Sequence, residues 1–191
     1  MVKNIIFDIG GVMFDDSTQN ISNILNENAE ELCKKVYGAS FRDCVLGTLE
    51  VANYIESFKG NPDYDKIKYI LGRENLPISY PLMKNHFDYI SQLKDMGYHL
   101  YLLSNITRES YEYVNSTICI DKFFDGGVYS FQEKLLKPDK KIYELIVNRY
   151  QLNKDETIFF DDKQRNVDVA CEFGIKSFVF HSIKDIENIL S

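Results

Sequence analysis

The sequence predicts an α/β fold: a three-layer core around a parallel sheet, with a small α-helical domain inserted after the first strand. Three observations support this prediction. Short apolar runs alternate with amphipathic helical stretches from residue 98 onward, which is typical of parallel strands joined by helical crossovers. A further strand-like run stands alone at residues 3–8. Between these two regions, residues 15–80 show only the three- and four-residue spacing of helices.

The first strand is predicted at residues 3–8, where Ile5, Ile6 and Phe7 form a short apolar run that ends at Asp8. The segment that follows is expected to fold as a small bundle of three or four helices, because no convincing strand occurs in it. The helices of this bundle should end at three breaks. These breaks are Gly38, the run Gly60-Asn61-Pro62, and Pro77.

The remaining elements alternate along the chain. Strands are predicted at 98–103, 123–129, 157–160 and 177–180, and helices at 81–96, 107–116, 139–150 and 166–173. Such alternation forms one parallel sheet with right-handed crossovers, and we expect the first strand to belong to the same sheet. The predicted domains are a core of residues 1–14 and 81–191 and a helical domain of residues 15–80.

The composition argues against several classes of protein. A net charge of −7, with 22 scattered Lys and Arg residues, does not suit a nucleic-acid surface. No apolar stretch approaches the roughly 20 residues of a membrane helix, and the N-terminus shows no signal peptide. The four cysteines lie far apart and are expected to be reduced, mostly buried thiols. We therefore expect a cytoplasmic monomer or homodimer that contacts neither nucleic acid nor membrane.

Polar side chains follow several of the predicted strands. Because the carboxyl ends of parallel strands share one edge of the sheet, these side chains can meet although they are distant in sequence. Each has an ordinary explanation when taken singly, such as a helix cap, a turn or a surface charge. Their joint occurrence favours a functional site. The predicted cluster consists of Asp8, Ser104, Asn105, Lys137, Asp161 and Asp162.

The acidic members of this cluster suit the transfer of a phosphoryl group. A carboxylate, here Asp8, can attack phosphorus and so divide hydrolysis into two easier steps. The nucleophile and a dianionic substrate repel each other, so cations must lie between them. Mg²⁺ prefers carboxylate oxygens and water. Asp8, Asp161 and Asp162 would supply the carboxylates of a magnesium site.

The other members of the cluster suit the binding of phosphate oxygens. Lys137 would act as a point charge that neutralises both a phosphate oxygen and the nucleophile. The Ser104 hydroxyl and the backbone N–H of Asn105 would bind a further phosphate oxygen. Donors fixed in this way contribute about 3–4 kcal/mol each when they face developing charge. The residues therefore predict a small-molecule phosphate ester as the substrate.

Four segments resemble the motifs of the haloacid dehalogenase-like hydrolase superfamily. The resemblance implies a Rossmann-like core, residues 15–80 as a helical cap over the active site, and Asp8 as the nucleophile. It also implies a Mg²⁺-dependent phosphatase that acts on a small phosphorylated metabolite, such as a sugar phosphate, through an aspartyl-phosphate intermediate. The four segments are Phe7-Asp8-Ile9-Gly10-Gly11-Val12, Leu102-Leu103-Ser104-Asn105, Lys137-Pro138-Asp139 and Phe159-Phe160-Asp161-Asp162, the last continuing through Asn166.

The sequence departs from the superfamily pattern at one position. Most phosphatases of the superfamily carry a second Asp two residues after the nucleophile as general acid and base, and Gly10 stands there in this sequence. The backbone carbonyl of Gly10 can still ligate Mg²⁺, but it cannot transfer a proton. Asp15 is a candidate substitute, although we favour a capping role for it at the start of the first inserted helix, together with Asp16 and Ser17.

Three other functions remain open on the sequence alone, one of which is phosphoryl transfer to a second substrate instead of water. A hydrolytic dehalogenase would also use an aspartyl nucleophile and would tolerate Gly10. It needs no metal, however, and the adjacent carboxylates Asp161 and Asp162 favour one. A catalytically degenerate member that binds a phosphorylated ligand or a protein partner is the second alternative, and Gly10 is the one feature in its favour.

Overall fold

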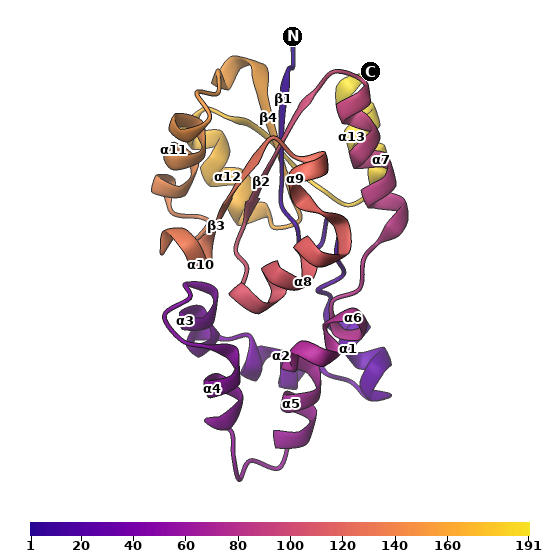
Figure 1. Ribbon diagram of the computed structural model, residues 1–191, viewed down its shortest axis with the longest axis vertical. Coiled ribbons are helices and arrows are strands. Elements are labelled where there is room, and N and C mark those ends of the chain that lie inside the picture. The colour runs from indigo at the N-terminus through magenta and orange to yellow at the C-terminus, as the bar shows by residue number, and fades with distance from the viewer.

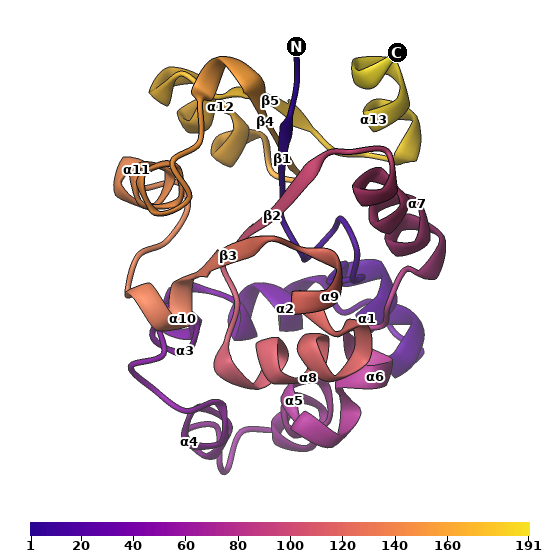
Figure 2. The same ribbon diagram turned by 45° about the horizontal axis from the view of Figure 1, so that its top comes forward.

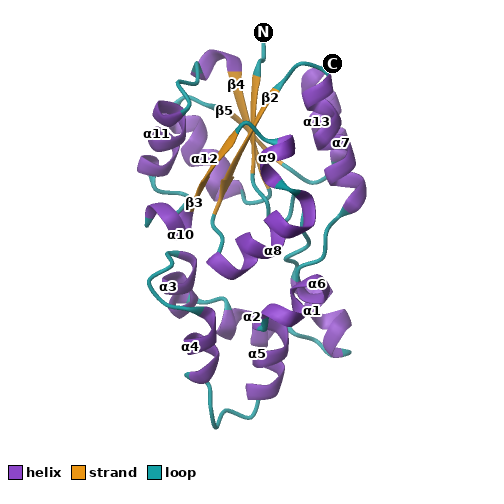
Figure 3. Ribbon diagram, viewed as in Figure 1, coloured by secondary structure: helices purple, strands orange, loops and turns teal.

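A five-stranded parallel sheet forms the centre of the structure, a computed structural model that describes residues 1–191 (Figures 1 and 3). The strand order is β3-β2-β1-β4-β5, and every neighbouring pair is parallel. The predicted α/β fold class is confirmed, and the N-terminal strand lies in the middle of the sheet. The strands are β1 (Asn4–Phe7), β2 (His99–Ser104), β3 (Gly126–Tyr129), β4 (Thr157–Asp161) and β5 (Lys176–Val179).

Helices cover both faces of this sheet (Figure 2). Successive side chains of β1 alternate between the faces: Ile5 and Phe7 pack in one hydrophobic cluster with residues of α7, α8 and α13, and Ile6 packs in another with residues of α11 and α12. Burial on both faces explains why the strands are apolar throughout. The helices of the core are α7 (Lys84–Asp95), α8 (Arg108–Ile118), α9 (Ile120–Phe123), α10 (Ser130–Glu133), α11 (Lys140–Arg149), α12 (Gln164–Phe173) and α13 (Ile183–Leu190).

Residues 18–79, called here the helical insertion, contain helices and no strand, and they lie beyond the carboxyl ends of the strands (Figure 1). The insertion has a hydrophobic cluster of its own, which includes Val36, Tyr54 and Ile67. It contains more helical segments than the three or four predicted, because two of them are single turns. The segments are α1 (Thr18–Leu25), α2 (Glu30–Val36), α3 (Arg42–Val45), α4 (Val51–Glu56), α5 (Tyr64–Leu71) and α6 (Leu76–Ser79).

Several sequence predictions need correction. Pro77 does not break a helix: it occupies the first turn of α6, where a missing N–H costs nothing, and α5 ends instead at Gly72. The third strand begins at Gly126 and not at residue 123, because α9 occupies the preceding residues. The cysteines are not mostly buried, since Cys119 and Cys171 are exposed while the other two are buried.

The C-terminal helix α13 was not predicted, although the sequence carries a signal for it. The Ser182 side chain accepts the backbone N–H of the third helical residue, Asp185, whose carboxylate in turn accepts the backbone N–H of Ser182, and together they form a capping box. Ile186 is fully buried against the sheet. None of the helices combines the length and the apolar composition that a membrane crossing would require.

Several contacts attach the helical insertion to the core: the first place is the chain crossings and the second is the start of α10, and Glu109 and Glu112 of α8 also contact Val51 and Arg73 of the insertion. At the chain crossings, residues 13–15 and 81–83 form a short hydrogen-bonded ribbon: Asp15 N donates to Pro81 O at 2.9 Å, and Met83 N donates to Met13 O at 2.8 Å. At the second place, the buried Ser130 hydroxyl donates to the carbonyl of Val45 in the insertion, at 2.7 Å. The same hydroxyl accepts the N–H of Ile106 at 2.9 Å.

Lys134, just after α10, adds to the second attachment. Its ammonium group donates to the carbonyl oxygens of Leu46 and Gly47 in the insertion and of Phe131 in the core, each at 2.8 Å. The start of α10 therefore holds both the loop after β2 and the turn after α3. This arrangement fixes how the insertion sits above the sheet edge.

The Ser130 contact predicts a specific loss of stability. Replacing Ser130 by Ala leaves the buried N–H of Ile106 without a partner, so we expect the free energy of unfolding to fall by about 1–3 kcal/mol. The exposed Ser116, whose hydroxyl donates to Tyr113 O at 2.7 Å, offers the matched control. Ser116→Ala should change the stability by no more than about 0.5 kcal/mol. Urea unfolding of both variants measures the difference, and equal losses would contradict the bridging role of Ser130.

Candidate active site

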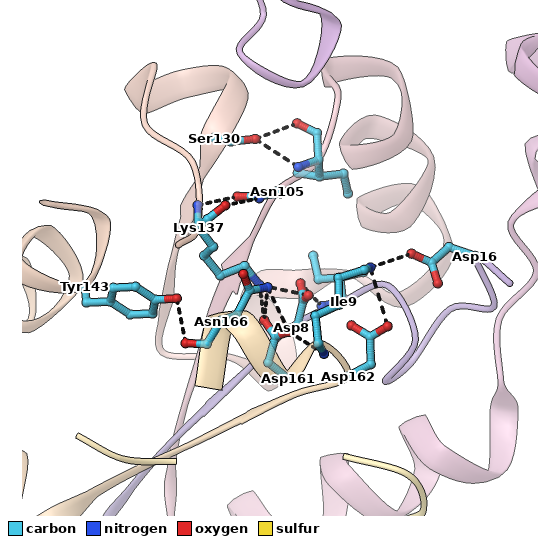
Figure 4. Close-up of polar contacts among 12 residues, drawn as sticks. Asp8, Ile9, Asp16, Asn105, Ser130, Lys137, Tyr143, Asp161, Asp162 and Asn166 are labelled. Atoms are coloured by element: carbon cyan, nitrogen blue, oxygen red, sulfur yellow. Dashed lines mark hydrogen bonds and ion pairs between the residues drawn. The ribbon is translucent and has the colours of Figure 1, made fainter. Parts of the chain in front are cut away.

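Asp8 follows β1 directly, at the edge of the sheet that faces the helical insertion (Figures 1 and 4). Its carboxylate is almost fully buried. Oδ1 accepts the backbone N–H of Ile9 at 2.7 Å, and Oδ2 lies 2.8 Å from Nζ of Lys137. Backbone and lysine thus hold both oxygens in a fixed orientation.

Lys137 joins Asp8 to Asp161. Its side chain is completely buried, and Nζ lies 2.6 Å from Oδ2 of Asp161, the last residue of β4. The Asn105 side chain positions the lysine: its amide oxygen accepts the N–H of Lys137 at 2.8 Å, and its amide nitrogen donates to the Lys137 carbonyl at 2.9 Å. The carboxyl ends of β1, β2 and β4 therefore converge through one cation, as the parallel register requires (Figure 4).

Asp161 has the most complete set of hydrogen bonds in the cluster. Besides Lys137, it accepts the N–H of Lys163 at 2.9 Å and the Asn166 side-chain amide at 2.9 and 3.0 Å. Asn166 is itself held by the hydroxyl of Tyr143, which donates to its carbonyl at 2.9 Å. Neither Asn166 nor Tyr143 was among the predicted site residues, although Asn166 lies within the fourth motif. A polar side chain on the first turn of a helix that follows the acidic pair was the available signal for Asn166.

The surroundings shift the pKa values of Asp8 and Asp161 in opposite directions. Burial raises the pKa of Asp8 to about 7, against the lowering effect of Lys137. Burial also acts to raise the pKa of Asp161, but Lys137 and the other donors outweigh it and hold that pKa below its usual range. Lys137 loses solvation on burial, yet the two carboxylates keep its pKa above the ordinary value. The lysine is therefore a permanent cation.

Asp162 completes an acidic group that one lysine cannot neutralise. Its Oδ1 atom is buried and has no hydrogen-bond partner, while Oδ2 lies 3.4 Å from Nζ of Lys163. One carboxylate oxygen from each of Asp8, Asp161 and Asp162 can be chosen so that all lie within 4.8 Å of one another. An unpartnered buried carboxylate oxygen is costly unless a cation meets it. Three oxygens at this spacing fit a Mg²⁺ ion.

Gly11 makes the position of Asp162 possible. Its φ angle is +68°, and a Cβ atom at this residue would lie 2.5 Å from Cγ of Asp162. Only glycine accepts both the left-handed backbone and this close approach. The turn after Asp8 is therefore shaped to admit the third carboxylate.

Ser104 and Asn105, which were predicted to bind phosphate, differ in their contacts with the rest of the chain. Ser104 ends β2, and its hydroxyl makes no hydrogen bond to another residue, so it is free to meet a ligand. The Asn105 side chain is occupied by Lys137, which leaves its backbone N–H, without an acceptor in the chain, as the group that can serve a phosphate. That the Asn105 N–H binds phosphate stays a prediction, and the sequence did not indicate that the side chain would position Lys137.

Asp15 and Asp16, the two acids that follow Gly10, have different surroundings. Asp15 accepts the N–H of Ser17 at 2.9 Å, a local turn before α1, and does not line the cavity above the site. Asp16 does line it, and its Oδ2 lies 2.7 Å from where a Cβ of Gly10 would be. Adjacent residues of a loop point in different directions, and the sequence does not reveal which one turns inward.

A cavity of about 900 Å³ lies between the sheet edge and the helical insertion. Asp8, Asn105 and Lys137 form part of its floor, and residues of the insertion, among them Tyr37 and Arg42, form part of its walls. The cluster therefore faces a cavity that residues of the core and of the insertion line together.

Comparison with known proteins identifies the family. Residues 5–180 match the haloacid dehalogenase-like hydrolase family. The chain belongs to this family. It is 25% identical to the phosphorylated carbohydrates phosphatase of Thermotoga maritima, over 99% of this chain and 90% of that protein. It is also 24% identical to the D-ribitol-5-phosphate phosphatase of Bacteroides thetaiotaomicron, over 93% of this chain and 91% of that one.

Solved structures of this hydrolase family have the same fold. A HAD family enzyme from Bacteroides thetaiotaomicron, in complex with magnesium and inorganic phosphate, superposes with a TM-score of 0.74 at 20% identity. The match covers 100% of both chains. The family membership that the four motifs suggested is confirmed.

The close approach of Gly11 to Asp162 leads to a test of the metal site. Gly11→Ala should displace Asp162, so we expect Mg²⁺ to raise the melting temperature of the unchanged protein but not that of the variant. Gly97→Ala is the matched control, because Gly97 has a φ of +92° but open space around its Cβ position. Both substitutions carry the left-handed strain of about 1–2 kcal/mol. A Gly11→Ala protein that responds to Mg²⁺ as the Gly97→Ala protein does would disprove the proposed geometry.

Proposed function

We propose that this hydrolase is a Mg²⁺-dependent phosphatase that cleaves a small phosphorylated metabolite through an aspartyl-phosphate intermediate on Asp8. The observation that carries the proposal is the buried cluster in which one lysine serves two carboxylates and a third carboxylate keeps an unpartnered oxygen. The relatives named for phosphorylated carbohydrates and D-ribitol 5-phosphate support it.

Asp8, Asp161 and Asp162 are the residues that would hold the Mg²⁺ ion, together with the backbone carbonyl of Gly10. When bound, the ion supplies positive charge that offsets the repulsion between a phosphate dianion and the nucleophile. The acidic cluster fits this requirement, because two ammonium groups, on Lys137 and Lys163, face the four carboxylates of Asp8, Asp16, Asp161 and Asp162.

The protein's own groups account for the remaining steps. Asp8 attacks phosphorus and forms an acyl phosphate as the bond to the leaving alcohol breaks. Lys137 holds Asp8 in place and neutralises charge on the transferred group. The free Ser104 hydroxyl and Asn105 N–H bind a phosphate oxygen at the end of β2. Water then attacks the phosphoryl group and restores the Asp8 carboxylate.

The cavity supports a small substrate. Its volume of about 900 Å³ admits a metabolite and excludes a folded phosphoprotein. We propose that residues 15–80 form the cap and that polar groups on its inner wall, such as Arg42, contact the leaving group. The names of the two relatives make sugar and polyol phosphates the first compounds to try.

The dehalogenase alternative is less well supported. A hydrolytic dehalogenase would leave the buried oxygen of Asp162 without any cation, at a cost of about 1–3 kcal/mol or more for a charged group. Halide release from a 2-haloacid in the absence of Mg²⁺ would nevertheless favour it over the phosphatase.

The nucleophile can be tested directly. Asp8→Asn should lower the Mg²⁺-dependent release of phosphate from a panel of sugar and polyol phosphates by about 10⁴-fold or more, as loss of a nucleophile does elsewhere. The fold should survive, because burial already disfavours the charged form of Asp8 and Lys137 keeps Asp161 as a partner.

The exposed Asp168, which accepts a hydrogen bond from Gln164 at 2.7 Å, provides the same chemical change away from the site. Asp168→Asn should retain full activity. Phosphate release and thermal unfolding are the two measurements. A folded Asp8→Asn protein with activity near that of the unchanged protein would show that the nucleophile is misassigned.

A further inference from the structure

Hydrolysis of a phosphate ester, the function proposed above, needs a group that moves protons. The alcohol leaves as an alkoxide unless an acid protonates it, and the attacking water must lose a proton in the second step. The group must lie in the cavity that Asp8 faces. Four acidic side chains line this cavity: Asp8, Asp16, Glu30 and Glu109.

Two of these four are engaged elsewhere. Glu109 accepts the backbone N–H of Val51 at 3.1 Å and so caps the start of α4. Glu30 pairs with Lys34 at 2.9 Å within α2, and this hydrogen bond holds the pKa of Glu30 below its usual range. With Asp8 assigned as the nucleophile, Asp16 is the acid that remains.

Asp16 lies beside the nucleophile's own loop (Figure 4). Its Oδ2 is 2.7 Å from the Cβ position of Gly10, two residues after Asp8, and 3.5 Å from Nζ of Lys163. The carboxylate therefore occupies the space that a side chain at residue 10 would fill. The absence of a side chain at Gly10 is what allows Asp16 to reach this point.

The Tyr80 hydroxyl also lies there, 3.3 Å from the same Cβ position. Burial raises the pKa of Tyr80 well above its ordinary value, with Asp16 and Asp8 adding to the effect. Tyr80 therefore keeps its proton. It cannot act as a base toward water.

We propose that Asp16 is the general acid and base of this enzyme. In the first step an Asp8 oxygen bonds to phosphorus, the ester P–O bond breaks, and its electron pair goes to the alcohol oxygen, which takes the proton of the Asp16 carboxyl group. In the second step the Asp16 carboxylate takes a proton from water as the water oxygen bonds to phosphorus. The P–O bond to Asp8 breaks, its electron pair returns to the Asp8 carboxylate, and inorganic phosphate leaves.

p-Nitrophenyl phosphate tests this role with one probe, because nitrophenolate is stable without a proton. With Mg²⁺ present, Asp16→Asn should still phosphorylate Asp8 but fail to activate water. We expect a burst of about one nitrophenolate per protein, a steady rate lower by about 10²–10⁴-fold, and phosphorylated protein in the intact mass spectrum. Asp15→Asn is the matched control and should behave as the unchanged protein, with no accumulated intermediate.

The possible results are separable. If the unchanged protein releases no nitrophenolate, the phosphatase function itself fails. If the unchanged protein is active but Asp16→Asn is slow without a burst, or turns over as Asp15→Asn does, the assignment of Asp16 is overturned. Lys163→Met examines whether Asp16 acts merely by holding Lys163: we expect no accumulated phosphoprotein, and a burst equal to that of Asp16→Asn would overturn the proposal.

Discussion

The buried ion pairs of Lys137 with Asp8 and Asp161 are the interaction on which the rest of the site depends. Three charged groups from three distant parts of the chain lie in contact where water is excluded, and none could be buried there alone. Removing the lysine would leave two carboxylates facing each other. The hydrogen bonds of Asn105 to the Lys137 backbone are therefore as much a part of the site as the charges themselves.

The negative charge of the cluster exceeds what its lysines supply, and this excess favours the binding of a cation. Lys137 and Lys163 supply two positive charges against the three carboxylates of Asp8, Asp161 and Asp162, and the buried Oδ1 atom of Asp162 has no partner. Gly11 makes room for Asp162, and Asn166 orients Asp161, so both help to bring the carboxylates together. The protein's own groups leave negative charge at the site unpaired. A phosphatase that depends on a bound cation requires such a site.

The sequence was informative where the backbone alone decides position. Residues at the ends of neighbouring parallel strands must share an edge, so the convergence of Asp8, Ser104 and Asp161 followed from strand order. Side-chain direction in loops was not predictable in this way. Asp15 and Asp16 are equivalent in the sequence, and only the hydrogen bond from Ser17 to Asp15 shows which one turns away. The bridging role of Ser130 likewise depends on tertiary contacts, which no periodicity reveals.

The ribbon between residues 13–15 and 81–83 determines where the chain leaves the core and enters the insertion. Its two backbone hydrogen bonds pair the chain segments that connect the core to the insertion, and Asp16 is the next residue after the first segment. Asp16 directly follows this backbone pairing, so the chain segment that carries its carboxylate is anchored to the core at the crossings and not to α1–α6 alone.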